Sequence, residues 1–197
     1  MTSSPAIYLV DDDSAILDSL SFLMESYGFP LTPYAEGERF LEEVDLSLPG
    51  CVILDSRMPG LSGQDLQRHL VAARSPLAVI FLTGHGDVPM AVEAFKAGAF
   101  DFFQKPVKGQ ELAAALREGL AQSQARFETG QQQAKLATLS VRERAVFDRV
   151  IQGHTNKQMA DSLCVAVRTI EVHRANMMKK LGVDSLAALM QLASQRP

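Results

Sequence analysis

The sequence of 197 residues has few cysteines and no long apolar run. Its two cysteines, Cys51 and Cys164, lie in a predicted strand and a predicted helical region, so we expect two reduced, mostly buried thiols. No stretch approaches the roughly 20 apolar residues of a membrane-spanning helix, and the start MTSSPAIYLV lacks the pattern of a signal peptide. We therefore expect a cytoplasmic, globular protein that does not contact a membrane.

The net charge of −4 hides an asymmetry along the chain. Residues 1–120 carry 17 acidic and 8 basic side chains, a net charge of −9. Residues 140–197 carry 5 acidic and 9 basic side chains, a net charge of +4. An acidic domain joined to a basic one suggests that only the second half of the chain meets nucleic acid.

Short apolar runs alternate with amphipathic helical patterns over residues 1–122. The runs lie at 7–10, 51–54, 78–82 and 102–104, with a weaker strand at 31–34 that Pro33 interrupts. This alternation is typical of parallel strands that are buried on both faces and separated by helices. The first half therefore predicts an α/β fold, a five-stranded, parallel, doubly wound sandwich.

The composition changes after Leu120, where glutamines mix with alanines and one glycine, Gly130. This composition predicts a helical extension followed by a polar linker, which we place at residues 123–138. The remaining residues, 139–197, show no strand pattern and predict an all-α domain.

Four helices are predicted in this second domain. Ser140 and Glu143 fit a capping box that begins the first helix, and Asn156 is expected to cap the second. A three-residue turn at 164–166 precedes a longer helix at about 167–181, and Ser185 begins the last helix. Two helices joined by a tight turn are the helix-turn-helix pattern of DNA-binding proteins.

Four of the apolar runs in the first half end on residues suited to phosphoryl chemistry. These are the acidic triplet Asp11, Asp12 and Asp13, the carboxylate Asp55, the hydroxyl Thr83 and the ammonium Lys105. Because sites form at the carboxyl ends of parallel strands, we expect these groups to converge. Crowded carboxylates favour a cation, and Mg²⁺ prefers oxygen ligands. The alternative for the triplet alone is a simple helix cap.

The segments YLVDDD, VILDSRMPGLSG, VIFLTGHGD and AGAFDFFQKP resemble the receiver domain of bacterial response regulators. The resemblance covers about residues 5–122 and implies a flavodoxin-like fold in which a histidine kinase phosphorylates Asp55. It also implies a Mg²⁺ site that includes Asp55 itself. Asp12 would bind the ion directly, Asp11 partly through water, and Arg57 through its backbone carbonyl.

The same resemblance implies a switch that follows phosphorylation. Lys105 would pair with the phosphoryl oxygens and precede a cis peptide bond, and Thr83 would move to hydrogen-bond the phosphoryl group. Phe102 would swing into the vacated space, although a core residue that never switches is the alternative. His85 either influences dephosphorylation or has no role.

Residues 136–194 resemble the LuxR/FixJ-type helix-turn-helix domain, which implies that the helix at 167–181 enters the major groove. The candidate DNA-binding residues are Lys157, Arg168, Thr169, Glu171, Val172, Arg174 and Lys179. The candidates for phosphate contacts are Lys157, Thr169, Arg174 and Lys179. Glu171 is suited to a cytosine amino group and Val172 to a thymine methyl. For each basic residue, the alternative is an ordinary solvated helix face.

This second segment departs from the family at Ala166, where a serine or threonine usually precedes the DNA-reading helix. The alanine removes an N-cap that is worth about 0.5–2 kcal/mol of helix stability. The last helix, residues 185–193, is either the family's usual dimer surface or simply closes the small core.

Together the two resemblances imply a transcription regulator rather than an enzyme. Phosphorylation of Asp55 would switch dimerisation and sequence-specific DNA binding. The implied partners are a sensor histidine kinase, double-stranded DNA, RNA polymerase and, after phosphorylation, a second copy of the chain.

Two alternatives belong to other functional classes. A Mg²⁺-dependent phosphatase generally needs a second acid two residues after the nucleophile, where this chain has Arg57. A phosphorylation-independent DNA-binding protein with a vestigial receiver does not explain the intact set of Asp55, Thr83 and Lys105.

Overall fold

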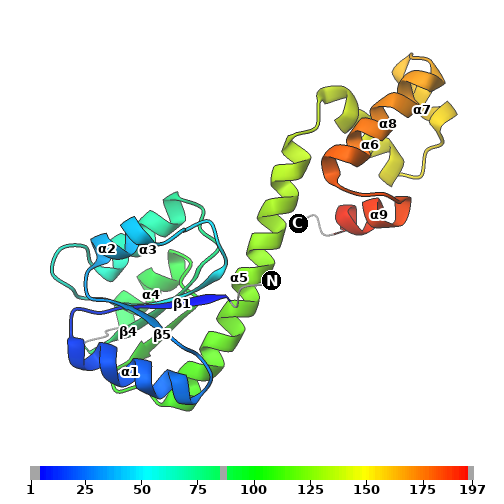
Figure 1. The fold of residues 1–197 in the computed structure, drawn as a ribbon. Helices are drawn as coiled ribbons and strands as arrows, with labels where there is room; N and C mark the ends of the chain where they lie inside the picture. The colour runs from blue at the N-terminus through cyan, green and yellow to red at the C-terminus, as the bar shows by residue number, and fades with distance from the viewer. Residues whose placement is uncertain (1–4, 85–87, 195–197) are drawn as a thin grey trace. The chain divides into compact units, whose positions relative to one another are not determined.

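The computed structural model describes residues 5–84 and 88–194. The chain divides into two compact units between Phe127 and Glu128 (Figure 1). The first unit has two hydrophobic clusters and the second has one, so each unit is described by itself. Over the described ranges, we find no helix with the length and apolar character needed to cross a membrane.

The first unit is built on a parallel sheet of five strands in the order β2-β1-β3-β4-β5. The strands are β1 (Ala6–Val10), β2 (Thr32–Tyr34), β3 (Gly50–Asp55), β4 (Ala78–Thr83) and β5 (Asp101–Gln104). All residues of β3 and β4 are buried, as continuous apolar runs predict. The strand with Pro33 is short and lies at the sheet edge, where a missing N–H costs least.

Helices cover both faces of this sheet (Figure 1). One face packs against α1 (Ser14–Ser26) and the first turns of α5 (Gly109–Ala137), in a cluster that includes Leu17 and Leu112. The other face packs against α2 (Gly37–Glu43), α3 (Gly63–Ala72) and α4 (Val88–Lys96), in a cluster that includes Phe40, Leu66 and Ala94. The predicted doubly wound α/β fold is confirmed.

The helix α5 continues through the stretch that the sequence predicts to become a polar linker. Residues 123–137 are helical, because alanine, glutamine and lysine are good helix formers and Gly130 costs only about 1 kcal/mol. Ser123 is fully buried in the first unit, where its hydroxyl accepts the Gly50 N–H at 2.9 Å. Leu136 belongs to the core of the second unit.

The described part of the second unit is helical, as predicted. Its four helices after α5 are α6 (Val141–Ile151), α7 (Asn156–Leu163), α8 (Val167–Leu181) and α9 (Leu186–Ser194). The expected capping box of Ser140 and Glu143 is present at α6. Phe147, Ile170 and Leu189 are fully buried where α6, α8 and α9 pack together.

Two local predictions in this unit are wrong. Asn156 does not cap α7: Thr155 does, because it forms a reciprocal capping box with Gln158 and leaves Asn156 as the first helical residue. Cys164 is exposed rather than buried, because it follows the last residue of α7 in a left-handed turn at φ 53°. Cys51 is buried as expected, and burial raises its thiol pKa to about 12.

The buried carboxylate of Glu143 links α6 to α8 through an ion pair. Glu143 Oε2 accepts from Lys180 Nζ at 2.7 Å and from the Ser140 N–H at 2.7 Å. The hydrogen bond from Lys180, followed by the one from the Ser140 N–H, lowers the pKa of Glu143 to about 2. Because Lys180 lies in the last turn of α8, this pair fixes the end of the helix expected to read DNA.

We predict that Glu143→Gln lowers the free energy of unfolding of the second unit by about 1 kcal/mol at pH 7, because it removes a charge-assisted hydrogen bond. The carboxylate's contribution is complete above its ordinary pKa of 4.5 and is lost as the pH falls through about 2. The difference between variant and wild type should therefore shrink across that interval.

Urea unfolding followed by far-UV circular dichroism measures this difference. The 3 tyrosines all lie in the first unit, so tyrosine fluorescence follows the unfolding of that unit and separates it from the unfolding of the second unit. A difference that stays constant down to about pH 2 would contradict the assignment.

Candidate functional site

A cavity of about 290 Å³ opens beyond the carboxyl ends of β1, β3 and β4. It is lined by Asp11, Asp12, Asp13, Asp55, Arg57, Thr83, Gly84 and Lys105. The structure therefore brings together the polar residues that the sequence places at four separate strand ends. Among the switch candidates that the structure describes, Thr83 and Lys105 line this cavity and Phe102 does not.

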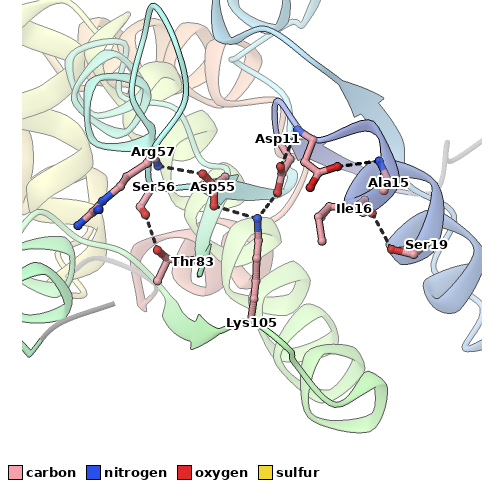
Figure 2. Close-up of polar contacts among 10 residues, drawn as sticks. Asp11, Ala15, Ile16, Ser19, Asp55, Ser56, Arg57, Thr83 and Lys105 are labelled. Carbon is pink, nitrogen blue, oxygen red and sulfur yellow. Dashed lines mark hydrogen bonds and ion pairs between the residues drawn. The ribbon is translucent and has the colours of Figure 1, made fainter. Parts of the chain in front are cut away.

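Lys105 joins the two buried carboxylates of the cavity (Figure 2). Its Nζ donates to Asp11 Oδ2 at 2.5 Å and lies 3.0 Å from Asp55 Oδ1. Burial raises the pKa of Asp11, although the hydrogen bond from Lys105 opposes this. Burial alone would lower the pKa of Lys105, but its bonds to Asp11 and Asp55 outweigh that effect and raise it. The ammonium is therefore charged and offsets the repulsion between the carboxylates.

Both carboxylate oxygens of Asp55 are held in place. The Arg57 N–H donates to Oδ2 at 2.9 Å, while Oδ1 faces the ammonium of Lys105 (Figure 2). Only 9% of the Asp55 side chain is exposed. The carboxylate is thus oriented by the backbone on one side and by a cation on the other.

The acidic triplet divides into three environments. Asp11 is buried, and its Oδ1 accepts the Asp13 N–H at 3.0 Å. Asp13 is the N-cap of α1, since its side chain accepts the Ala15 N–H at 2.9 Å. Asp12 is exposed and lines the cavity. The helix-cap alternative therefore applies to Asp13 and not to Asp11.

The donor set fits a hard divalent cation. Carboxylate oxygens of Asp11, Asp12 and Asp55, with the carbonyl of Arg57, are the ligand types that Mg²⁺ prefers. Within residues 5–84 and 88–194, no three acidic, histidine or cysteine side chains form a ready-made metal cluster. Lys105 instead lies between Asp11 and Asp55, and its ammonium shows that positive charge is stable at this point.

The hydroxyl of Thr83 is paired with a residue that the sequence analysis missed. Thr83 ends β4 and is 1% exposed, and Ser56 Oγ donates to its Oγ1 at 2.6 Å (Figure 2). Ser56 directly follows Asp55 and is also 1% exposed. A polar side chain at the end of an otherwise apolar, buried strand was the signal that could have identified it.

Phe102 lies on β5, in register with Phe81 on β4. The two ring centroids are 6.2 Å apart, and Phe102 is half-buried. This position is compatible with both interpretations of Phe102, a switching ring or a core residue. His85 lies outside the described residues. The peptide bond between Lys105 and Pro106 is cis, as the resemblance implied.

The helix-turn-helix is formed by α7, the turn 164–166 and α8, whose bounds agree with the predicted ones. Arg168, Glu171, Val172 and Lys179 are exposed on α8, and Lys157 is exposed on α7. Ala166 is the N-cap of α8 and makes no side-chain cap bond. These exposed side chains are accessible to a ligand.

Two of the candidate DNA-binding residues are less accessible than the others. Thr169 is half-buried. Arg174 is also half-buried, and its Nη1 donates to Asn156 Oδ1 at 3.0 Å. This bond joins α8 to the start of α7 and holds the guanidinium in one place.

The last helix, α9, closes the core through Leu189, which is fully buried. Leu186 and Met190 on the same helix are 49% and 43% exposed. The helix therefore contributes to the core and also presents apolar side chains to solvent.

Comparisons with known proteins cover both units. Residues 7–117 match the model of the response regulator receiver domain, and residues 137–193 match that of bacterial regulatory proteins of the luxR family. The chain is 43% identical to the transcriptional regulatory protein FixJ of Bradyrhizobium diazoefficiens, covering 98% of this chain and 96% of that protein. It is 44% identical to the tetrathionate response regulatory protein TtrR of Salmonella typhimurium, covering 94% and 90%.

Solved structures show similarity over almost the whole chain. The low-resolution structure of the response regulator StyR has a TM-score of 0.73 at 39% identity, covering 98% of this chain and 100% of that one. Full-length FixJ from B. japonicum has a TM-score of 0.58 at 40% identity, with 98% of each chain covered.

Gly63 provides a test of how closely the site is packed. A Cβ at this first residue of α3 would clash with the carbonyl oxygen of Asp55 and lie 2.9 Å from the Phe81 ring. We predict that Gly63→Ala lowers the free energy of unfolding of the first unit by about 1–3 kcal/mol, as overpacking does. Urea unfolding followed by tyrosine fluorescence measures the change.

Gly130→Ala is the matched control, because nothing lies within 4 Å of a Cβ at that position. It should leave the tyrosine-monitored transition of the first unit unchanged. If Gly63→Ala also left it unchanged, the close approach of α3 to Asp55 would not constrain the site.

Proposed function

Because the chain belongs to the two-component response regulators that join a receiver domain to a LuxR-type DNA-binding domain, we propose that phosphorylation of Asp55 controls how α7 and α8 engage DNA. The family consists of transcription regulators rather than enzymes. The observation that carries the proposal is the contact of Asp55 Oδ1 with Lys105 at the cavity, 3.0 Å apart. This intact site argues against a vestigial receiver.

Asp55 is suited to accept a phosphoryl group from the histidine kinase through Oδ1. Oδ2 is engaged by the Arg57 N–H, so the carboxylate cannot rotate without losing that bond. Oδ1 lies beside Lys105, and the ammonium can pair with the oxygens of an arriving phosphoryl group. The backbone orients the nucleophile, and the lysine stabilises the product.

A magnesium ion would be held by carboxylates of Asp11, Asp12 and Asp55 and by the carbonyl of Arg57. When bound, it supplies neutralisation of the negative charge on the phosphoryl oxygens. Lys105 then exchanges its contacts with the carboxylates for contacts with the phosphoryl group. This exchange connects the chemistry at Asp55 to the β5–α5 segment that carries Lys105.

Thr83 and Phe102 form the proposed route from the site to the surface. Thr83 is the last residue of β4 and lines the same cavity as Asp55, so its side chain can respond to a phosphoryl group there. Phe102 lies on the neighbouring strand β5, where it pairs with Phe81 of β4. Movement of Thr83 toward the phosphoryl group would repack this aromatic ring and change the surface near α4 and β5.

The DNA contacts follow from the exposed face of the helix-turn-helix. Lys157, Lys179, Thr169 and Arg174 would bind phosphates, while Arg168, Glu171 and Val172 would face the bases. Asn156 would keep the Arg174 guanidinium oriented, as it does in this structure. The exposed Leu186 and Met190 of α9 are suited to contact a second copy on paired half-sites.

The remaining partners follow from the same proposal. A sensor histidine kinase would act as phosphodonor, RNA polymerase would receive the regulatory signal, and the site of action would be the cytoplasm. Phosphorylation would favour a dimer, which contacts two half-sites at a high effective concentration.

The first test is labelling of the full-length protein by a small phosphodonor such as acetyl phosphate. Wild-type protein should be labelled only with Mg²⁺ present, and Asp55→Asn should give background labelling because a weakly nucleophilic amide replaces the carboxylate. Asp18→Asn, an exposed change on α1, is the control and should be labelled normally. Wild-type labelling of the Asp55 variant would refute the assignment.

The second test separates positioning contacts from base contacts on the helix-turn-helix. Lys157→Ala and Lys179→Ala should weaken binding about equally on all sequences, and each should reduce the salt slope by about 1, as loss of a phosphate contact does. Glu171→Ala and Val172→Ala should change which sequences are preferred.

A binding selection on randomised DNA, with salt titrations alongside, measures both effects. Lys108→Ala, which removes a positive charge from the receiver, should change neither property. An unaltered sequence preference in both the Glu171 and Val172 variants would show that another face of α8 enters the groove.

A further inference from the structure

Ser56 makes a contact that the proposed function leaves unused. It lies between Asp55 and Arg57, two residues of the cavity, yet does not line the cavity itself. Its Oγ donates to Thr83 Oγ1 at 2.6 Å, across from β3 to β4 (Figure 2). The two residues are separated by 27 positions in sequence, so sheet register brings the hydroxyls together.

Both partners of this hydrogen bond are sheltered from water. Ser56 and Thr83 are each 1% exposed, and they lie at the ends of strands whose residues are all buried. A hydroxyl that loses its partner in such a place cannot turn to solvent instead. Movement of Thr83 away from Ser56 therefore has a free-energy cost.

We propose that Ser56 is a positioning residue that holds Thr83 in its unphosphorylated position and so raises the threshold for switching. This inference rests on the proposed function, in which Thr83 moves to a phosphoryl group on Asp55. In the unphosphorylated state the Ser56–Thr83 bond is made. In the phosphorylated state Thr83 exchanges it for the phosphoryl oxygen, and the bond opposes that exchange.

The direction of the effect follows from comparing the two states. Ser56→Ala removes the donor, so the unphosphorylated state loses a bond that the switched state has already given up. The switched state is therefore favoured in the variant, and a phosphoryl mimic should bind more tightly. A buried neutral hydrogen bond corresponds to roughly a two- to tenfold shift in such an equilibrium.

The test uses full-length protein titrated with beryllofluoride, an analogue of the phosphoryl group, at saturating Mg²⁺. Fluorine NMR measures the bound analogue directly, and light scattering follows dimerisation in the same samples. We expect the beryllofluoride concentration at the midpoint of the titration to be about two- to tenfold lower for Ser56→Ala than for wild type. Ser56→Thr keeps a hydroxyl at this position and should restore a midpoint near that of wild type.

A double-mutant cycle shows whether Ser56 acts through Thr83. In a Thr83→Ala background, Ser56→Ala should cause no further shift, because the bond is already absent. A midpoint in Ser56→Ala that is unchanged or raised would overturn the proposal. An equal shift in the Thr83→Ala background would do the same, by showing a general packing effect.

Failure of the proposed function has a different signature. In that case wild-type protein would not bind beryllofluoride, or Asp55→Asn would bind it as well as wild type. Either result would refute both the proposed function and the role of Ser56. If wild type responds, Asp55→Asn does not, and Ser56→Ala matches wild type, only the role of Ser56 is refuted. Tyrosine fluorescence checks that each receiver is folded.

Discussion

The ionic contact of Lys105 with Asp11 and Asp55 is the interaction on which the receiver site depends. Two carboxylates that are both almost fully buried repel each other strongly unless a positive charge lies between them. Lys105, the residue after β5, supplies this charge, and its own N–H extends the pairing with β4 by donating to the Thr83 carbonyl at 2.8 Å. Its side chain then reaches across the end of β4 to β3 and β1.

The strand order explains why these groups meet. In the order β2-β1-β3-β4-β5, the chain direction across the sheet reverses between β1 and β3, and a doubly wound sheet forms its binding crevice at such a point. Asp11 follows β1, and Asp55 ends β3. Removing charged groups from water has a large free-energy cost, so this buried ion pair is a poor source of stability. We interpret it instead as an arrangement in which Lys105 can exchange one negatively charged partner for another.

Much of this arrangement could be predicted from the sequence, because it depends on local patterns. Continuous apolar runs identified β3 and β4, and polar residues at their ends identified the site. The helix-turn-helix bounds were also predictable, since Gly182 and the turn at 164–166 limit α8 on both sides. The error at Asn156 was local as well: the spacing of Thr155 and Gln158 is a capping box that outweighs a lone asparagine.

Other features required tertiary structure. The Ser56–Thr83 pair depends on sheet register, and the Glu143–Lys180 pair joins residues 37 apart on different helices. Cys164 was expected to be buried from its residue type and its place in a predicted helical region, but a left-handed turn places it after the last residue of α7, where it is exposed. A helical extension after Leu120 was predicted, but its continuation to Ala137 was not, because a glutamine-rich, polar composition suits a helix as well as a flexible linker.

The short strand β2 has a consequence for how copies of this chain can associate. A sheet edge can grow by pairing its free N–H and C=O groups with a strand from another molecule. This edge offers 3 residues, and the central one, Pro33, has no N–H to donate. Strand addition is therefore blocked on the β2 side of the receiver, so self-association of this domain must use side chains on its helices or its opposite edge rather than a sheet continued at β2.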